Sequence, residues 1–280
     1  MATDAARDAM LLAASGTLAT PPRVAVDLPN ASLLLTAGAS PSAHGFRVYD
    51  RRATDDDQLT VVWHGPRLLG TITGLELGAR RTGALGAVAT DLLAPSGELE
   101  IGVVGTGRQA WTQVWALSHL RTIVHVRLHG RDPERRERFA RRLAAELGVS
   151  AVAVASAREA VEGAPVVILA TGSRTPVIEV DWLASTSHVS TVGPKLRHAH
   201  EWPIALADWA QLLASDAPEE LRATERHLIA GTVHAERVRS VGELIGSGWR
   251  RERDLRTVYL STGLPGSEVI LGERLLLNAG

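Results

Sequence analysis

Residues 99–110 read LEIGVVGTGRQA, and this stretch decides the fold of the chain. Its first part is a largely apolar run, which is typical of a strand covered on both faces. Gly105, Gly107 and Ala110 follow with the spacing G-x-G-x-x-A. The first glycine permits a tight turn, the second lets a pyrophosphate approach the backbone, and the small third residue lets the next helix pack on the strand. The stretch predicts a dinucleotide-binding loop, against the alternative of an ordinary glycine turn.

The residues after this loop alternate between apolar runs and helical patterns. A helix is predicted over 108–120, and a second one opens at Asp132 and Pro133, an N-cap residue followed by a proline at the first helical position. Ser156 and Glu159 have the spacing of a capping box at the start of a third. Further buried strands are predicted over residues 123–130, 151–156, 165–171 and 188–193. This alternation predicts an α/β fold, a Rossmann-type doubly wound parallel sheet.

The chain has a different character before residue 96. A helix is followed there by short β-like runs separated by Gly, Pro and Asp clusters, which predicts an antiparallel or mixed sheet. A helix of small residues over 76–94 then leads to the boundary. The last segment breaks the strand–helix rhythm and is expected to return to the first unit. We expect a mixed α+β substrate-binding and dimerisation domain, residues 1–96 with 256–280, and a dinucleotide-binding domain, residues 97–255.

The composition limits the classes of partner. The 280 residues carry a formal net charge of −1, so no overall positive charge favours nucleic acid or an anionic membrane. There is no cysteine, which excludes disulfides and thiolate metal sites. No apolar run reaches the roughly 18–20 residues needed to span a bilayer, and the N-terminus lacks a signal-peptide pattern. We expect a cytoplasmic protein that acts on a small molecule.

The end of the second strand of the parallel sheet bears on the choice of nicotinamide cofactor. Sites selective for NAD place an acidic residue there, against the 2′-hydroxyl of the ribose. Here the strand ends in LHGRD, with Arg131 near the expected place, and an arginine suits a 2′-phosphate. Asp132 keeps NAD open, although helix capping accounts for it better. The sequence therefore favours NADPH over NADH.

Several motifs together resemble the ornithine cyclodeaminase and μ-crystallin family. They are RRTGALGAVATDLLA at 80–94, GVVGTGRQA at 102–110, AREAVEGAPVVILATGSRTPVI at 157–178, TVGPKLRHAHEW at 191–202 and TVYLSTGLPGSEV at 257–269. The resemblance implies a homodimer whose first domains pair, with a Rossmann domain that carries NAD(H) or NADP(H). It also implies chemistry at a C=N bond beside a carboxylate, such as ornithine cyclodeamination, reduction of cyclic ketimines or amino-acid dehydrogenation.

Most candidate site residues lie in these motifs; Arg131 follows from the end of the second strand, and Arg23 and Arg47 from the stretches PPR at 21–23 and GFRVYD at 45–50. Cofactor contacts are expected at Gly105, Thr106, Gly107, Arg108, Gln109, Arg131, Thr171, Val192, Gly193 and Ser261. Substrate contacts are expected at Arg23, Arg47, Arg81 and Thr262. The arginines are candidates because a guanidinium can form two parallel hydrogen bonds with a carboxylate. Arg81 matches the family motif best, and one of the adjacent Arg80 and Arg81 is expected to be surface charge only.

Lys195 is the only lysine among the 30 basic residues. The resemblance places the catalytic aspartate of family cyclodeaminases at this position, and a substrate-binding lysine where this chain has Arg47. Arginine cannot exchange a proton near neutral pH, whereas a lysine whose pKa is lowered by burial can. We therefore hypothesise that Lys195 donates the proton in imine reduction. The alternatives are a solvated loop lysine or a partner of Glu201.

The expected activity is NAD(P)H-dependent reduction of an amino-acid-derived imine. Two alternatives stay open: a cyclodeaminase-like lyase that returns its NAD unchanged, and a relative that binds cofactor without catalysis. Loss of the family's lysine and aspartate argues against the lyase. No metal is expected, because His198 and His200 supply too few ligands. Asp216 is expected to cap the helix that follows it.

Overall fold

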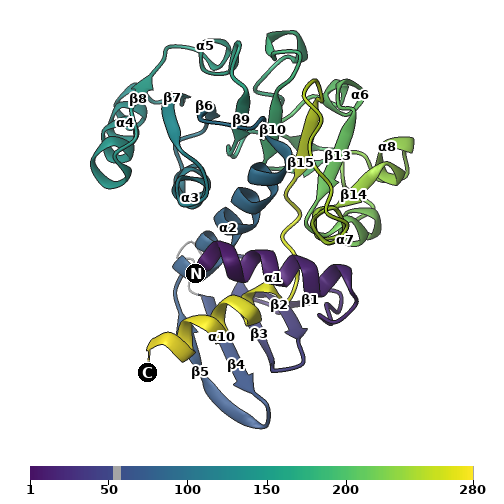
Figure 1. Ribbon diagram of the computed structural model, residues 1–280. Helices are drawn as coiled ribbons and strands as arrows, with labels where there is room; N and C mark the ends of the chain where they lie inside the picture. Colours follow the sequence, from purple (N-terminus) through teal and green to yellow (C-terminus); the bar gives the residue numbers. More distant parts are fainter. Residues whose placement is uncertain (53–57, 280) are drawn as a thin grey trace.

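The first part of the chain forms an antiparallel sheet in the order β1-β2-β3-β4-β5, in a computed structural model that describes residues 1–52 and 58–279 (Figure 1). Its elements are α1 Ala2–Ala14, β1 Val24–Asp27, β2 Ser32–Ala39, β3 Ala43–Asp50, β4 Gln58–His64, β5 Arg67–Thr73 and α2 Glu76–Leu93. The last helix, α10 Ser267–Ala279, lies on one face of this sheet, where Ala43 and Val62 pack with Val269. Segments from both ends of the chain thus pack together, with the sheet as one layer and α10 as the other.

The second sheet has eight parallel strands in the order β14-β13-β15-β10-β9-β6-β7-β8. Its strands are β6 Leu99–Val104, β7 Ile123–His129, β8 Ala151–Ala153, β9 Val166–Leu169, β10 His188–Thr191, β13 Leu212–Ser215, β14 Val238–Ser240 and β15 Thr257–Leu260. The helices between them are α3 Arg108–Ser118, α4 Pro133–Leu147, α5 Ala157–Val161, η1 Val180–Trp182, α6 Ala205–Trp209, α7 Pro218–Ala223, α8 Val233–Glu236 and α9 Val241–Gly246. A short hairpin joins β11 Lys195–Leu196 to β12 Ala199–His200. The expected α/β fold is confirmed.

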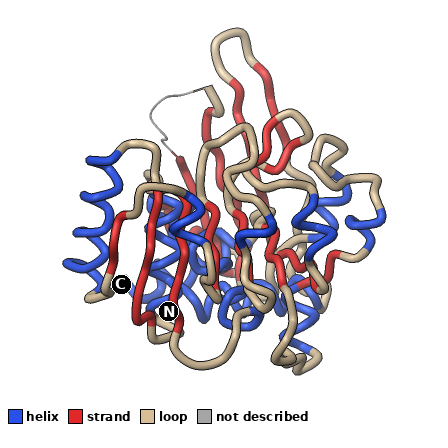
Figure 2. Tube along the Cα trace, turned by 90° about the horizontal axis from the view of Figure 1, so that it is seen from above, coloured by secondary structure: helices blue, strands red, loops and turns tan. Residues whose placement is uncertain are grey.

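Alternating side chains of the central strands fill two separate cores. Val166 and Ile168 of β9 belong to the core with α3 and α4, while Val167 and Leu169 belong to the core on the opposite face. This follows from the two-residue period of a strand, whose successive side chains point to opposite faces. Helices therefore flank the strands on both sides, as Figure 2 shows, and this double cover explains why these strands are apolar throughout.

The structure corrects one boundary of the sequence analysis. Residues 256–280 were expected to rejoin the first domain as one segment, but β15 lies inside the parallel sheet, between β10 and β13. Only the chain beyond Leu260 crosses to the small sheet, where α10 packs. The division into two units stays a prediction, now with the return placed after Leu260.

Helix α2 joins the two sheets. Its contact with α3, a helix that packs on the parallel sheet, is more extensive than the contact between any other two described elements. It also packs on α1 and α10. A Cβ on Gly83 would collide with the backbone of Thr112 in α3, so glycine is needed for this close approach. Among the described residues, no helix is both long and apolar enough to cross a membrane.

Candidate active site

The glycine loop lies where the connectivity of the parallel sheet reverses. From β6 the chain moves outward to β7 and β8, and then returns to β9 on the other side of β6. In open α/β sheets, ligands bind in the crevice that such a reversal leaves at the carboxyl ends of the strands. Gly105 has a φ of +121°, and a Cβ there would collide with the carbonyl oxygen of Ala170. Only glycine fits where these two loops meet.

A groove of about 450 Å³ runs along this crevice. Its lining includes Gly105, Thr106 and Gly107 of the loop, Arg131, Asp132 and Arg135 beyond β7, and Ala170, Thr171 and Gly172 beyond β9. A Cβ on Gly107 would meet no atom within 4 Å, so the backbone is open at this point, next to the N-terminus of α3. Free N–H groups and the partial positive charge of a helix N-terminus suit a diphosphate. The groove fits the pyrophosphate of a dinucleotide.

Two arginines and one aspartate lie at the β7 end of the groove. Asp132 accepts a hydrogen bond from the backbone N–H of Arg135 at 3.1 Å, so it caps α4 as expected. Arg135 also donates from Nε to the carbonyl oxygen of Thr106 at 3.3 Å, which ties α4 to the glycine loop. Arg131 lines the same end of the groove. Cationic side chains therefore outnumber acidic ones at this end of the groove.

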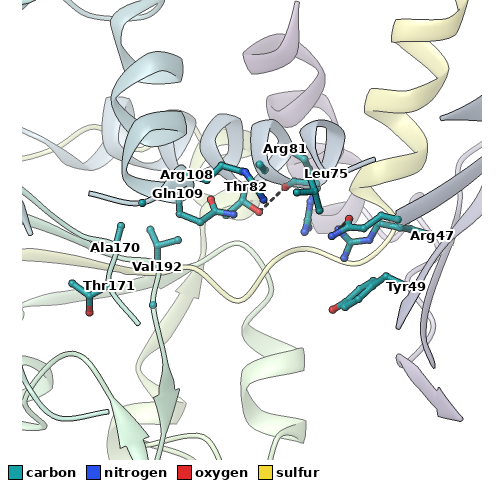
Figure 3. A pocket seen from close by; sticks show the side chains of 15 residues that line it. Arg47, Tyr49, Leu75, Arg81, Thr82, Arg108, Gln109, Ala170, Thr171 and Val192 are labelled. Atoms are coloured by element: carbon teal, nitrogen blue, oxygen red, sulfur yellow. Dashed lines mark hydrogen bonds between the residues drawn. The ribbon is translucent and has the colours of Figure 1, made fainter. Parts of the chain in front are cut away.

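A second pocket, of about 480 Å³, lies between the two sheets (Figure 3). The small sheet and α2 contribute Arg47, Tyr49, Gln58 and Arg81, while the parallel sheet contributes Arg108, Gln109, Thr171, Val192 and Gly193. Gly107, Ala170 and Thr171 line both cavities, so the groove and the pocket are continuous. A ligand that lies along the groove therefore reaches the pocket with one end.

Arg47 of β3 and Arg81 of α2 enter this pocket beside the buried carboxylate of Glu268. Nη2 of Arg47 lies 3.2 Å from Oε1 of Glu268, and Nη2 of Arg81 lies 3.6 Å from the same oxygen. Burial and the charge of Arg81 lower the pKa of Arg47, against the effect of Glu268. Burial alone would raise the pKa of Glu268, but Arg81 and Arg47 outweigh burial and lower it. Two cations share one anion, so a substrate carboxylate would complete the cluster.

Arg23 approaches the same cluster from the segment before β1. Its Nη2 donates to the carbonyl oxygens of Thr262 and Gly263, at 3.2 and 2.5 Å. A Cβ on Gly263 would lie 3.4 Å from Arg23 and 3.5 Å from Arg81, so both guanidinium groups approach this point. Arg23 thus holds the 262–263 loop behind the pocket, whereas Arg47 and Arg81 line it.

A single buried carboxylate, that of Glu201, holds the two loops beyond β9 and β10. Oε2 accepts from the backbone N–H and the hydroxyl of Thr171, at 2.7 and 2.8 Å. Oε1 accepts from the backbone N–H groups of Val192 and Gly193, at 3.1 and 2.5 Å. Both loops line the pocket, so Glu201 fixes the pocket wall that faces the arginines.

Lys195 lies close to this carboxylate and is absent from the described lining of the pocket. Its Nζ donates to the carbonyl oxygens of Val192 and Gly193, at 3.0 and 2.6 Å. Burial lowers its pKa to about 8, although Glu201 and Asp216 oppose the shift. The pKa suits proton exchange, as hypothesised, but the observed contacts direct the amine to the backbone. A catalytic role of Lys195 stays a prediction.

The structure places Ser261, Thr262 and Asp216 in one loop network rather than in the pocket. Ser261 donates from its backbone N–H to Thr191, and the hydroxyl of Thr262 pairs with Ser215 at 2.6 Å. The carboxylate of Asp216 accepts from the N–H groups of residues 262, 263 and 264, at 2.7 to 2.9 Å. The expectation that Asp216 caps the following helix is wrong, because its oxygens bind this loop instead.

Sequence reasoning missed several side chains that shape the pocket. Tyr49 and Gln58 lie in ordinary-looking strands, on the same face as Arg47, and Gln58 accepts from Arg47 at 3.3 Å. The two-residue period of β3 places Tyr49 on the face of Arg47, and this was the available signal. Glu268 lies 221 residues after Arg47, and no local pattern connects the two.

Comparisons with a protein-family model and with curated protein sequences identify relatives of this chain. The ornithine cyclodeaminase/mu-crystallin family model matches residues 65–271. The chain is 26% identical over 225 residues to the ketimine reductase mu-crystallin of Mus musculus, which covers 79% of this chain and 70% of that protein. It is 30% identical over 218 residues to the Δ1-pyrroline-2-carboxylate reductase of Bacillus cereus, which covers 74% of this chain and 66% of that protein. The segments matched in curated relatives span 45% to 70% of their lengths.

A solved archaeal alanine dehydrogenase dimer with bound NAD has the same fold. Its TM-score is 0.86 at 21% identity, and the superposition covers 99% of this chain and 90% of that one. The match therefore includes the small sheet as well as the parallel sheet. The family model covers most of the chain, and the motifs that carried the resemblance lie around the groove and the pocket. The chain belongs to the ornithine cyclodeaminase/mu-crystallin family.

Proposed function

We propose that this protein is an NAD(P)H-dependent reductase of an imine that carries a neighbouring carboxylate. The observation that carries the proposal is the continuity of the dinucleotide groove with a pocket that presents Arg47 and Arg81. The named reductases of the family act on ketimines and on Δ1-pyrroline-2-carboxylate. The substrate proposed here is therefore an imine derived from an amino acid.

The residues of the groove fit the nicotinamide cofactor. Gly105 and Gly107 leave the backbone bare beside the N-terminus of α3, where a pyrophosphate would bind. Thr171, Val192 and Gly193 would border the nicotinamide end, because they line the pocket into which the groove opens. When bound, the reduced cofactor supplies hydride to the imine carbon.

The other residues of the pocket orient the substrate. Arg47 and Arg81 offer several N–H donors, and a carboxylate between them would relieve the surplus positive charge beside Glu268. Glu268 in turn holds both guanidinium groups in place through its ion pairs with them. Behind these groups, Arg23 holds the 262–263 loop by a hydrogen bond to the carbonyl oxygen of Thr262. The imine would then lie between the arginines and the loops that Glu201 fixes.

We propose NADPH as the preferred cofactor, with NADH as the alternative. Arg131 and Arg135 lie where the 2′-position of the adenosine ribose is expected, and a guanidinium suits a phosphate there. Asp132 is engaged as the cap of α4, which weakens its claim to a ribose hydroxyl. Against this preference, the archaeal alanine dehydrogenase was solved with NAD.

We also propose a homodimer that forms through the small sheet. Val24, Leu35, Val48 and Leu59 lie opposite one another across β1 to β4, so they share one face. Val24 is 51% exposed and Leu59 is 37% exposed, while α10 covers the other face. An apolar row of this kind favours pairing with a second copy. Light scattering on the purified protein tests this state directly.

The activity is tested with purified protein, NADPH or NADH, and two cyclic ketimines, Δ1-piperideine-2-carboxylate and Δ1-pyrroline-2-carboxylate. We expect loss of the absorbance of the reduced nicotinamide, faster with NADPH. Ammonia release from ornithine without net change of the cofactor would instead identify the cyclodeaminase-like alternative. Cofactor binding without turnover of any imine would identify a non-catalytic relative and refute the proposal.

A further inference from the structure

Reduction of a C=N bond needs a proton at nitrogen as well as a hydride at carbon, and the pocket offers few groups that could supply it. Its polar lining within the described chain consists of Arg47, Tyr49, Gln58, Arg81, Thr82, Arg108, Gln109 and Thr171. Guanidinium groups do not give up a proton near neutral pH, and amides and aliphatic hydroxyls are poor acids. The hydroxyl of Thr171 also donates to Glu201. A phenol is the strongest acid of this set.

Tyr49 lies where such an acid is needed. It is two residues after Arg47 on β3, so both side chains rise from the same face of the sheet toward the parallel-sheet loops. Figure 3 shows the hydroxyl of Tyr49 pointing into the pocket, toward the side formed by Thr171 and Val192. The guanidinium carbon of Arg47 lies 5.2 Å from the centre of the Tyr49 ring. The phenol therefore lies beside Arg47, with its hydroxyl directed toward the cofactor end of the pocket.

We propose that Tyr49 is the catalytic acid that protonates the imine nitrogen, an assignment that rests on the proposed reductase function. As hydride adds to the carbon, the π electrons of C=N move to nitrogen, which takes the proton from the Tyr49 hydroxyl. The N–H bond forms while the phenolic O–H bond breaks, and water returns a proton to the oxygen afterwards. Arg47 is the counter-ion for the transient negative charge on the ring oxygen.

Lys195 is the competing candidate for this step. Its Nζ donates to the carbonyl oxygens of Val192 and Gly193, two residues of the pocket wall, while Lys195 itself is absent from the described lining. Two of the three N–H bonds of its ammonium group are engaged by these carbonyl oxygens. The side chain of Tyr49, by contrast, already lines the pocket.

The test compares Tyr49→Phe with two other variants. Phenylalanine keeps the ring beside Arg47 and removes only the hydroxyl. Tyr259→Phe is a matched control, because Tyr259 is the other of the two tyrosines and is fully buried outside the described lining of the pocket. Lys195→Met removes the competing amine. Each protein is assayed with NADPH on a cyclic ketimine and on the N-methylated iminium form of that ketimine, which needs hydride but no proton.

For Tyr49→Phe we expect kcat on the ketimine to fall by about 100-fold with nearly unchanged KM, since general acids contribute on this scale. On the N-methyl iminium the kcat of Tyr49→Phe should match that of the wild-type protein. Tyr259→Phe should match the wild-type protein on both substrates. A ketimine kcat of Tyr49→Phe within about threefold of the unchanged protein, or an equal loss on both substrates, overturns the assignment. The selective loss in Lys195→Met instead would transfer the role to Lys195. If the unchanged protein binds NADPH but reduces neither substrate, the reductase proposal itself fails.

Discussion

Replacement of Glu201 by glutamine is expected to damage stability and cofactor binding together. The carboxylate accepts two hydrogen bonds on each oxygen, from Thr171 and from the backbone of Val192 and Gly193. An amide keeps one of these oxygens and turns an NH₂ group toward two donors. Hydrogen bonds to a charged group contribute about 1.5–3 kcal/mol each, so losing two at a fully buried site costs about 3–6 kcal/mol. For a chain of this size, Tm should fall by at least about 5 °C.

Urea unfolding measures the stability term, and quenching of tryptophan fluorescence by NADPH at 20 °C measures binding to the folded variant. We expect Kd to rise at least about tenfold, because both loops at the nicotinamide end lose their shared anchor. The control is Glu159→Gln, since Glu159 is an exposed capping-box residue that accepts from Ser156 at 2.9 Å, and its loss should cost less than about 1 kcal/mol. A Glu201→Gln variant with unfolding energy within about 1 kcal/mol of the unchanged protein and the same Kd would refute the reasoning.

Three other changes test separate parts of the structure. Arg131→Ala should weaken NADPH binding by about tenfold while leaving NADH nearly unchanged in the same fluorescence titration, and equal effects on both would remove the 2′-phosphate argument. Arg81→Lys should raise KM for the ketimine by about tenfold because it loses the two-pronged contact, whereas the adjacent Arg80→Lys should not, since Arg80 pairs with Glu76 on the surface. Burial lowers the pKa of His188 to about 3, so the folded state keeps this ring neutral while the unfolded state binds a proton below about pH 6.5. The neutral ring therefore stabilises the fold fully above that pH, and about 2 kcal/mol of this stabilisation is lost at pH 5. Urea titrations should show a smaller loss of unfolding free energy between pH 7 and pH 5 in His188→Gln than in the wild-type protein.

The parallel sheet could be predicted because its signals are local. A strand buried on both faces needs an apolar run, and a helix needs a cap, as at Asp132 and Ser156, where the structure shows the expected contacts. The position of β15 could not be predicted in this way. Its sequence TVYL has the composition of any buried strand, and only the pairing with β10 and β13 assigns it to a sheet.

The candidate site was predictable to the extent that it follows motifs. The glycine loop and Arg81 match family patterns, and the structure brings them to one continuous cavity. The direction of a loop side chain depends on partners that are distant in sequence, and for this reason the contacts of Lys195 were beyond sequence reasoning. Tyr49 belongs to no motif, and its importance emerges only when the other lining residues are known.

The placement of α10 has a consequence for synthesis on the ribosome. Glu268 is synthesised 221 residues after Arg47 (268 − 47), which corresponds to roughly 10–45 s at ordinary elongation rates. Throughout that interval the small sheet lacks its covering helix, and Ala43 and Val62 have no Val269 to pack against. The parallel sheet can complete its core earlier, since β15 precedes α10 in the chain. The arginine pocket is thus assembled last during translation, and the nascent chain offers an apolar sheet face to chaperones until then.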